Sequence, residues 1–298
     1  ALYAVRPFGG SDISLQKTQL NKNYIGMRAT DGYFTLSKFR ENNFNGLGPL
    51  RNICGLASLN DIKVPIISGC FLVPLPYQPE RGFAGIYVQN IGVFDLPPLP
   101  YAAQNTFANL AVGIDAYDTN INIRENSRFA HITAGAYQFY GDAGLRVMDS
   151  DFNGGQTARF IGNGANSTQP EPDFDDCTNG IHLYANFVTT SIDLLKCKML
   201  NMQQGIYLDA ACGSFYGTTN GSPGNTFWGI RNNNIQASSF VSGLWPINGI
   251  YLRDWDATQS NVEISGNTVD VNIGDNSAGI HTMGANPSNT PTFQVDIR

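Results

Sequence analysis

The stretch Asn248-Gly249-Ile250-Tyr251-Leu252 and the later stretch Val262-Glu263-Ile264-Ser265-Gly266-Asn267-Thr268-Val269 are the two halves of one repeat unit. In the first half, apolar and polar side chains alternate after a glycine, which predicts a short strand with one buried face. We expect Ile250 and Leu252 to point into the core and Tyr251 to point outward. We expect Gly249 to supply a positive φ at the corner before the strand.

Copies of both halves occur along most of the chain. The first half recurs at Gly85, Gly113, Gly144, Gly180, Gly205, Gly249 and Gly279, with spacings of 28, 31, 36, 25, 44 and 30 residues. The second half is an apolar residue, two arbitrary residues, Asn or a small residue, one arbitrary residue and an apolar residue. It occurs at Phe39/Asn42/Phe44, Val147/Ser150/Phe152, Leu194/Cys197/Met199, Ile230/Asn233/Ile235 and Ile264/Asn267/Val269. We expect the stacked asparagines to take the left-handed conformation and to form a ladder of amide hydrogen bonds.

The two patterns resemble the repeats of right-handed parallel β-helix proteins, the pectate-lyase-like fold, and in particular those of large bacterial surface proteins. The resemblance covers residues 34–298. It implies an all-β, single-stranded, right-handed parallel β-helix, a solenoid of about nine coils with inserted loops. Residues 1–33 are expected to be an irregular segment or incomplete first coils. Because residues 293–298 alternate like a strand, we expect the solenoid to continue beyond residue 298 as part of a larger chain or assembly.

Composition agrees with many short strands joined by tight turns. Of the 298 residues 42% are hydrophobic and only 14% are charged, and 32 are glycine. The formal net charge of -6 argues against a nucleic-acid partner. No apolar run approaches the roughly 18 residues of a membrane span, so no membrane insertion is expected. The five cysteines contain no C-x-x-C pair, which argues against a zinc site. We expect these cysteines to be small buried core residues, or to form disulfides if the protein is exported.

The outward positions of the first half-units are the most informative candidates for function. In chain order they hold Tyr87, Asp115, Arg146, His182, Tyr207, Tyr251 and His281. If the coils stack in register, these residues form one exposed ribbon with five aromatic rings, which suits a polysaccharide or another surface protein as partner. We therefore predict that the ligand-binding residues are Tyr87, His182, Tyr207, Tyr251 and His281. The alternative is that these rings only cover the scaffold, or lie beneath the inserted loops.

Three carboxylates lie close together in sequence at Asp173, Asp175 and Asp176, and could hold Ca²⁺. Their spacing lacks the glycine and the terminal Glu of a helix-loop-helix calcium site. We therefore expect no cofactor, with Ca²⁺ as the alternative.

An enzymatic alternative rests on a second set of charged residues. The resemblance implies that hydrolases of this fold use paired carboxylates, and that lyases use Ca²⁺ or a basic side chain. The candidates for such roles are Asp209, Arg253, Asp254, Asp256 and Glu263. No catalytic signature of the family accompanies them.

The sequence therefore favours a non-catalytic β-helix segment of an exported bacterial cell-surface or filament protein. It would act in adhesion or assembly by binding a glycan or a protein, outside the cell or at its surface. The alternative is a polysaccharide lyase or glycoside hydrolase, including an enzyme of the phage tailspike type.

Overall fold

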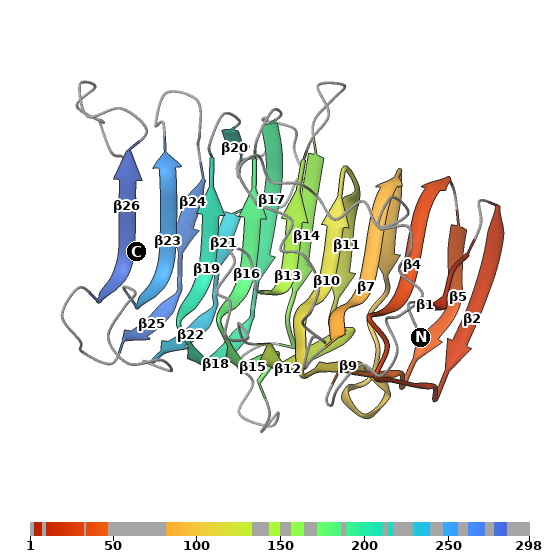
Figure 1. Cartoon of the computed structure of the whole chain (residues 1–298). Helices are drawn as coiled ribbons and strands as arrows, with labels where there is room; N and C mark the ends of the chain where they lie inside the picture. The colour runs from red at the N-terminus through yellow and green to blue at the C-terminus, as the bar shows by residue number, and fades with distance from the viewer. Residues whose placement is uncertain are drawn as a thin grey trace, which may run out of the picture.

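The computed structural model describes residues 3–7, 10–32, 34–46, 82–132, 143–149, 156–163, 172–185, 189–210, 214–216, 229–238, 247–255, 262–271 and 277–284. These residues form parallel strands that stack side by side, from β1 and β2 at one end to β26 at the other (Figure 1). The arrangement is all-β, with three long parallel sheets, and is compatible with a β-helix solenoid.

The longest sheet, which we call S1, has nine strands. They are β1 (Tyr3–Val5), β4 (Ile25–Gly32), β7 (Gly82–Ile91), β10 (Leu110–Tyr117), β13 (Ala143–Met148), β16 (Asn179–Tyr184), β19 (Gln204–Asp209), β23 (Asn248–Trp255) and β26 (Ala278–Gly284).

Two further sheets, S2 and S3, complete the coils. S2 has seven strands, namely β8 (Val93–Leu96), β11 (Asn120–Arg124), β14 (Gln156–Ile161), β17 (Thr189–Leu195), β20 (Ser214–Tyr216), β21 (Gly229–Arg231) and β24 (Glu263–Ser265). S3 has eight, namely β3 (Gln19–Asn21), β6 (Asn43–Asn45), β9 (Asn105–Ala108), β12 (Ser127–Ile132), β15 (Phe174–Cys177), β18 (Lys198–Met202), β22 (Asn234–Ala237) and β25 (Thr268–Val271). A separate two-stranded sheet pairs β2 (Ser11–Gln16) with β5 (Phe34–Arg40).

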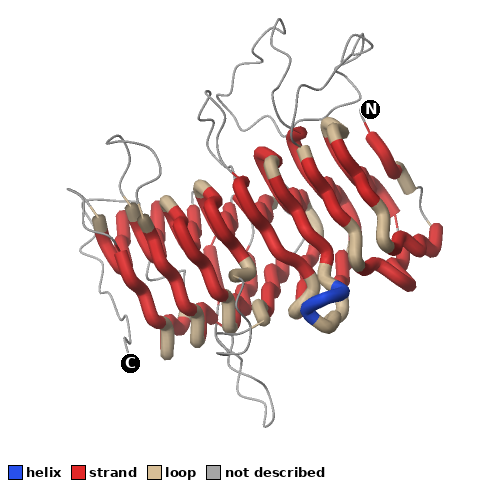
Figure 2. Tube along the Cα trace, turned by 90° about the horizontal axis from the view of Figure 1, so that it is seen from below, coloured by secondary structure: helices blue, strands red, loops and turns tan. Residues whose placement is uncertain are grey.

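From β7 onward the chain visits the sheets in the order S1, S2, S3 before it returns to S1 one coil further on; in the first two coils β2 and β5 take the place of S2. Each strand therefore pairs with the strand one coil earlier and one coil later. Between β8 and β9, the short 3-10 turn η2 (Tyr101–Ala103) stands out from the corner between S2 and S3 (Figure 2).

Residues 1–33, expected to be irregular or incomplete coils, contain four of these strands. β1 and β4 pair with each other in S1, and β4 also pairs with β7. β3 pairs with β6 in S3. The parallel stack thus begins well before residue 34, where the sequence repeat was first evident.

The core lies inside the coils and is continuous along the stack. Phenylalanines at equivalent positions of S3 stack face to face: Phe44, Phe107, Phe129 and Phe174 follow one another with ring centroids 4.7, 5.0 and 4.8 Å apart. Ile250 and Leu252 are buried, as their alternation predicts.

The glycines that open the first half-units have a different role from the one expected. Gly249 does not have a positive φ, and neither do the equivalent glycines of the other coils. Instead, a Cβ on Gly113 would lie 2.4 Å from the Phe129 ring and 2.5 Å from the carbonyl oxygen of Gly144. Real Cβ atoms are not found at such distances. From Gly85 to Gly249 the glycines recur because an S3 side chain and the next coil leave no room for a Cβ; Gly279 is not crowded in this way.

Positive φ is instead supplied by polar residues at the three corners of the coils. Between S1 and S2 these are Asn90, Asp118 and Asp254, with Asp31 at the equivalent place between β4 and β5. Between S2 and S3 they are Glu125, Lys196, Asn232 and Gly266, with Lys17 and Glu41 at the equivalent places between the two-stranded sheet and S3. Between S3 and S1 they are Lys22, Asn109, His131, Asp176 and Asn201. The left-handed residue comes directly before the repeated asparagine, as in Asn232 before Asn233 and Gly266 before Asn267. The expectation that the repeated asparagine itself is left-handed is therefore wrong.

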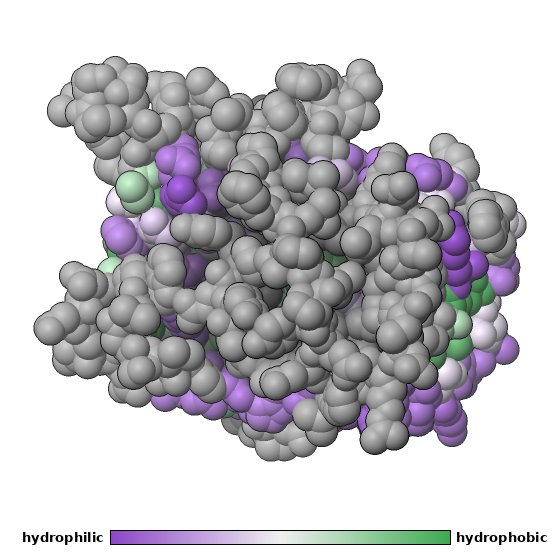
Figure 3. Space-filling view, in the orientation of Figure 1, coloured by the Kyte–Doolittle hydropathy of each residue, from purple (hydrophilic) through white to green (hydrophobic). Residues whose placement is uncertain are grey.

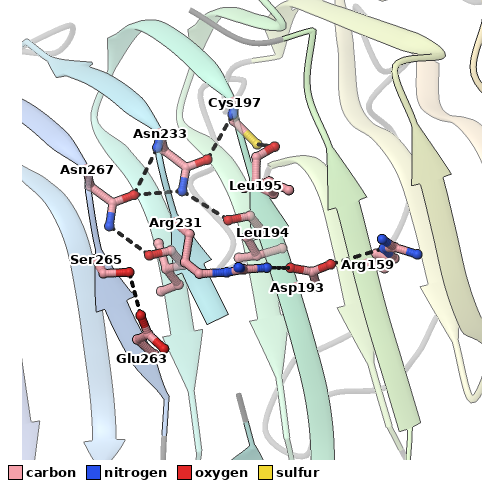
Figure 4. A network of polar contacts seen from close by, with 11 residues as sticks. Arg159, Asp193, Leu194, Leu195, Cys197, Arg231, Asn233, Glu263, Ser265 and Asn267 are labelled. Atoms are coloured by element: carbon pink, nitrogen blue, oxygen red, sulfur yellow. Dashed lines mark hydrogen bonds and ion pairs between the residues drawn. The ribbon is translucent and has the colours of Figure 1, made fainter. Parts of the chain in front are cut away.

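The predicted asparagine ladder is present at the corner between S2 and S3 (Figure 4). Asn233 Oδ1 accepts a hydrogen bond from the Cys197 backbone N–H at 2.8 Å, and Asn233 Nδ2 donates to Asn267 Oδ1 at 2.9 Å. A second run joins Asn42 to Asn105 at 3.0 Å and Asn105 to Asn126 at 2.6 Å. The ladder satisfies buried backbone groups where the chain turns from one sheet to the next.

Two details of the repeat need correction or qualification. The second half-unit is not one strand, because Ile230 lies in β21 and Ile235 in β22, on either side of the corner. The match at Val147 is fortuitous, since Val147 belongs to β13 of S1, while residues 150 and 152 lie outside the described residues.

Of the cysteines, Cys177 and Cys197 are buried free thiols, as expected of core residues. Residues 54, 70 and 212 lie outside the described part.

Candidate functional site

The outer face of S1 carries a continuous column of polar and aromatic side chains, which we call the S1 column. Strand register places its members opposite one another on successive strands, in the order Arg28, Tyr87, Asp115, Arg146, His182, Tyr207, Tyr251 and His281. The seven outward positions that the repeat identified are thus in one register. The structure adds Arg28, which the sequence analysis missed because its strand, β4, begins Ile25-Gly26-Met27 and lacks the Gly-Ile pair.

Four rings at one end of the S1 column form an unbroken stack. His182 lies 4.3 Å from Tyr207 between ring centroids, with the planes 5° apart. Tyr207 and Tyr251 are 5.0 Å apart, and Tyr251 and His281 are 4.9 Å apart. One ring per coil at the strand spacing of about 4.8 Å produces this stacking directly.

The S1 column is not exposed along its length, contrary to the expectation. Tyr87, His182 and Tyr207 are only 3%, 6% and 7% exposed. Tyr251 and His281 are half-buried. Of the five predicted ligand-binding rings, only these last two are therefore accessible to a partner. Figure 3 shows that hydrophilic side chains predominate among the described atoms at the lower edge of the molecule, while hydrophobic ones are visible at its right-hand edge.

In the middle of the S1 column, Asp115 and Arg146 form a buried ion pair. Arg146 Nε and Nη2 each donate to one oxygen of Asp115 at 2.8 Å. The side chain of Asp115 is completely buried and that of Arg146 is 8% exposed. The guanidinium also lies 5.6 Å from the centre of the Phe83 ring. This pair is a fixed part of the scaffold, because separating the two buried charges would cost several kcal/mol of folding free energy.

His182 is a buried imidazole between the Arg146 and Tyr207 positions. Neither of its ring nitrogens has a hydrogen-bond partner among the described residues. Burial, together with the positive charges of Arg146 and Arg253, lowers the pKa of His182 to about 3. The ring is therefore uncharged at neutral pH.

Acid should destabilise the protein through His182. The group is protonated near its ordinary pKa of 6.5 in the unfolded chain but only near 3 in the folded chain. The stability that depends on it is present above pH 6.5 and is lost as the pH falls toward 3, by up to about 1.4 kcal/mol per pH unit. Between pH 7 and pH 5 we expect the wild-type protein to lose about 2 kcal/mol more than His182→Phe, as measured by urea unfolding.

His281→Phe is the matched control for this experiment, because His281 is half-buried at the end of the same stack. It should keep the pH dependence of the wild-type protein. An equal pH dependence in His182→Phe and wild type would show that His182 is not the responsible group.

Beside the accessible end of the stack, Arg253 lies between two carboxylates. Its Nη1 is 3.5 Å from Asp209 Oδ2, and its Nε is 3.4 Å from Asp254 Oδ2. Tyr207 joins the group by donating its hydroxyl to Asp209 Oδ2 at 3.0 Å. The hydrogen bond to Tyr207 raises the pKa of Arg253. Desolvation opposes this rise, and the nearby negative charges add to it. Desolvation, together with the charge of Asp209, raises the pKa of Tyr207.

The remaining catalytic candidates do not join this cluster. Glu263 belongs to β24 in S2, where it accepts a hydrogen bond from the Ser265 hydroxyl at 2.7 Å. Asp256 lies outside the described residues. The structure thus brings together Asp209, Arg253 and Asp254, which come from β19 and β23.

The three carboxylates considered for Ca²⁺ have separate partners. Asp173 is buried and accepts hydrogen bonds from the backbone N–H of Lys198 at 2.8 Å and from Asn163 Nδ2 at 2.6 Å. Burial raises the pKa of Asp173, and these hydrogen bonds oppose the rise. Asp175 accepts from Asn201 at 2.9 Å, and Asp176 pairs with His131. Among the described residues no group of three or more His, Cys, Asp or Glu side chains is placed to hold a metal ion.

A second column on S1 was missed by the sequence analysis. Asn179, Gln204 and Asn248 stand in register on β16, β19 and β23. Asn248 is fully buried, and neither of its amide atoms has a partner within the described residues. The signal was available, because an amide residue precedes the glycine in each of these three half-units.

Comparisons with known proteins do not assign this chain to a family. No family model matches the sequence. No curated protein and no solved structure matches it either. In the described part of the chain there is no helix of the length and apolar character needed to cross a membrane.

Proposed function

We propose that this protein is a glycan-binding, non-catalytic segment of an exported bacterial cell-surface or filament protein, and that it acts in adhesion or assembly. We also propose that its solenoid is a right-handed, pectate-lyase-like β-helix of about nine coils. The nine strands of S1 support the coil number. The general right-handedness of parallel crossovers supports the hand.

The observation that carries the functional proposal is the ring stack that becomes accessible at Tyr251 and His281. Sugar rings bind to aromatic faces through their C–H groups, while their hydroxyls need donors and acceptors at the ring edge. Arg253 and Asp254 supply such groups on the same strand as Tyr251. Because Tyr207 and His281 cover the two faces of the Tyr251 ring, what a sugar can reach among the described residues is the edge of Tyr251 and the outer face of His281. An apolar surface of this kind, bordered by charged hydrogen-bonding groups, favours a glycan over a purely apolar ligand.

The same cluster favours binding over cleavage. Hydrolysis by two carboxyl groups requires one of them to carry a proton for the leaving group. Asp209 and Asp254 instead both form ion pairs with Arg253. A lyase would need a basic side chain able to release its proton, and the raised pKa of Arg253 opposes this role.

Tyr251→Ala should weaken glycan binding at least tenfold without unfolding the protein. The half-buried ring stacks on Tyr207 and His281, and its hydroxyl makes a long contact with Met283 Sδ at 3.5 Å, so its removal also lowers the stability of the protein, by about 0.5–1.5 kcal/mol per lost stack. Loss of the contact between the sugar and the accessible ring edge is worth roughly 1–2 kcal/mol of binding free energy. Isothermal titration calorimetry against a panel of neutral and acidic oligosaccharides would measure the change.

Tyr101→Ala is the matched control, because Tyr101 is also half-buried but lies at the corner between S2 and S3. It should bind like the wild type. Equal affinities for wild type and Tyr251→Ala would remove the ring stack as the binding surface. Release of reducing ends or of unsaturated products from any polysaccharide would instead favour the lyase or hydrolase alternative.

A further inference from the structure

The accessible end of the S1 column holds an unequal set of charges. Arg253 is 38% exposed and Asp254 is 30% exposed, whereas Asp209 is 6% exposed. One guanidinium between two carboxylates leaves a local charge of about -1. Desolvation raises the pKa of both Tyr207 and Tyr251, so these hydroxyls stay uncharged and do not alter this balance at neutral pH.

Part of this cluster is available to a ligand. Arg253 uses Nη1 toward Tyr207 and Asp209, and Nε toward Asp254. Within the described residues, Arg253 Nη2 and Asp254 Oδ1 make no hydrogen bond or ion pair. As far as the described residues go, a hydrogen-bond donor and a hydrogen-bond acceptor are therefore left open on adjacent residues, beside the Tyr251 ring.

Adjacent hydroxyl groups of a sugar match this pair. One hydroxyl can donate to a carboxylate oxygen while its neighbour accepts from a guanidinium N–H, because each hydroxyl is both donor and acceptor. Hydrogen bonds to charged groups are the strong ones. A uronic acid would bring a third carboxylate to a cluster that already has an excess of negative charge, so repulsion would oppose it.

We infer that the accessible end of the S1 column selects uncharged sugars with adjacent hydroxyl groups over uronic acids, and that Asp254 is the specificity-determining residue. The inference rests on the proposed function, because it names the class of glycan for the same surface. Tyr251 supplies an apolar ring edge, since its two faces are stacked on Tyr207 and His281. Arg253 supplies the donor, and Asp254 both the acceptor and the excess negative charge.

The test compares matched oligosaccharides that differ only in the carboxylate, such as glucose and glucuronate, galactose and galacturonate, or mannose and mannuronate oligomers. Wild-type protein should bind the neutral member of a pair at least tenfold more tightly at low salt. The difference should shrink as the salt concentration rises. Asp254→Asn should weaken neutral binding about tenfold and reduce the discrimination against the uronate.

Asn is a suitable replacement, because Asp254 has a φ of 51° and Asn tolerates the left-handed conformation. Asp270→Asn is the matched control: it removes the same charge from an exposed position of β25 in S3. It should behave like the wild type.

The outcomes separate the two proposals. Wild-type protein that binds neither class of sugar contradicts the proposed function, and the inference with it. Binding of neutral and acidic sugars with equal affinity leaves glycan binding intact and overturns the inference. So does an Asp254→Asn variant with unchanged discrimination, or an Asp270→Asn variant that changes it as much.

Discussion

Arg146→Met should lower the free energy of unfolding by about 3–5 kcal/mol, because it leaves the Asp115 carboxylate buried without its counter-ion. Asp115 is completely inaccessible and takes two hydrogen bonds from the guanidinium. Methionine fills a similar space but offers no donor. Urea unfolding at pH 7, followed by circular dichroism, would measure the loss.

Two further variants make this experiment specific. The double variant Asp115→Leu/Arg146→Met removes both charges, and we expect it to recover most of the lost stability. Arg40→Met removes an exposed arginine that donates to Gln16 at 3.0 Å, and should change stability by less than about 0.5 kcal/mol. A loss of under about 1 kcal/mol in Arg146→Met would mean that the buried pair contributes little.

Gly113→Ala should destabilise the protein by at least about 2–3 kcal/mol, although the change adds a single methyl group. The new Cβ would lie 2.4 Å from the Phe129 ring and 2.5 Å from the Gly144 carbonyl oxygen. The ring belongs to the face-to-face stack with Phe107 and Phe174, and the carbonyl belongs to the next strand of S1, so neither can move alone.

Gly279→Ala tests the same substitution at the same position of the repeat without the crowding. Among the described residues its new Cβ would meet Val269 alone, at 3.9 Å, which is an ordinary contact. The change should be neutral or slightly stabilising, because alanine restricts the unfolded chain. If both variants lose the same stability, the loss comes from the backbone preference of glycine and not from the packing of the next coil.

The main features of the fold could be predicted from two sequence patterns. Alternation after Gly-Ile identified S1 strands from β7 onward, and the second half-unit identified the corner between S2 and S3, where the asparagine ladder forms. What these patterns could not supply was the reason for each residue. Gly249 and Asn267 were both assigned left-handed backbone, since that is the common use of both residue types. In the structure the glycine avoids a clash and Gly266 supplies the turn.

The candidate site shows a similar division. A strict period of two tells on which face of a strand Tyr87 or Tyr251 lies, and the register followed from the regular coil. It does not tell how much of that face remains accessible, because exposure depends on segments distant in sequence. Tyr87 and Tyr251 occupy equivalent positions, yet one is buried and the other is half-buried. Nor could the sequence pair Asp209 with Arg253 and Asp254, beyond placing them one coil apart.

The strict coil-to-coil pairing of S1, S2 and S3 has a consequence for how such a chain folds. In S1 from β10 onward, each new strand docks on one 25 to 44 residues earlier, at the spacing of the glycine repeat. The entropy lost in closing each coil is therefore nearly constant, since it depends only weakly on loop length. Relative contact order falls as coils are added, so a longer chain of this kind need not fold more slowly. Any two adjacent coils can act as the nucleus from which the others are added, in either direction.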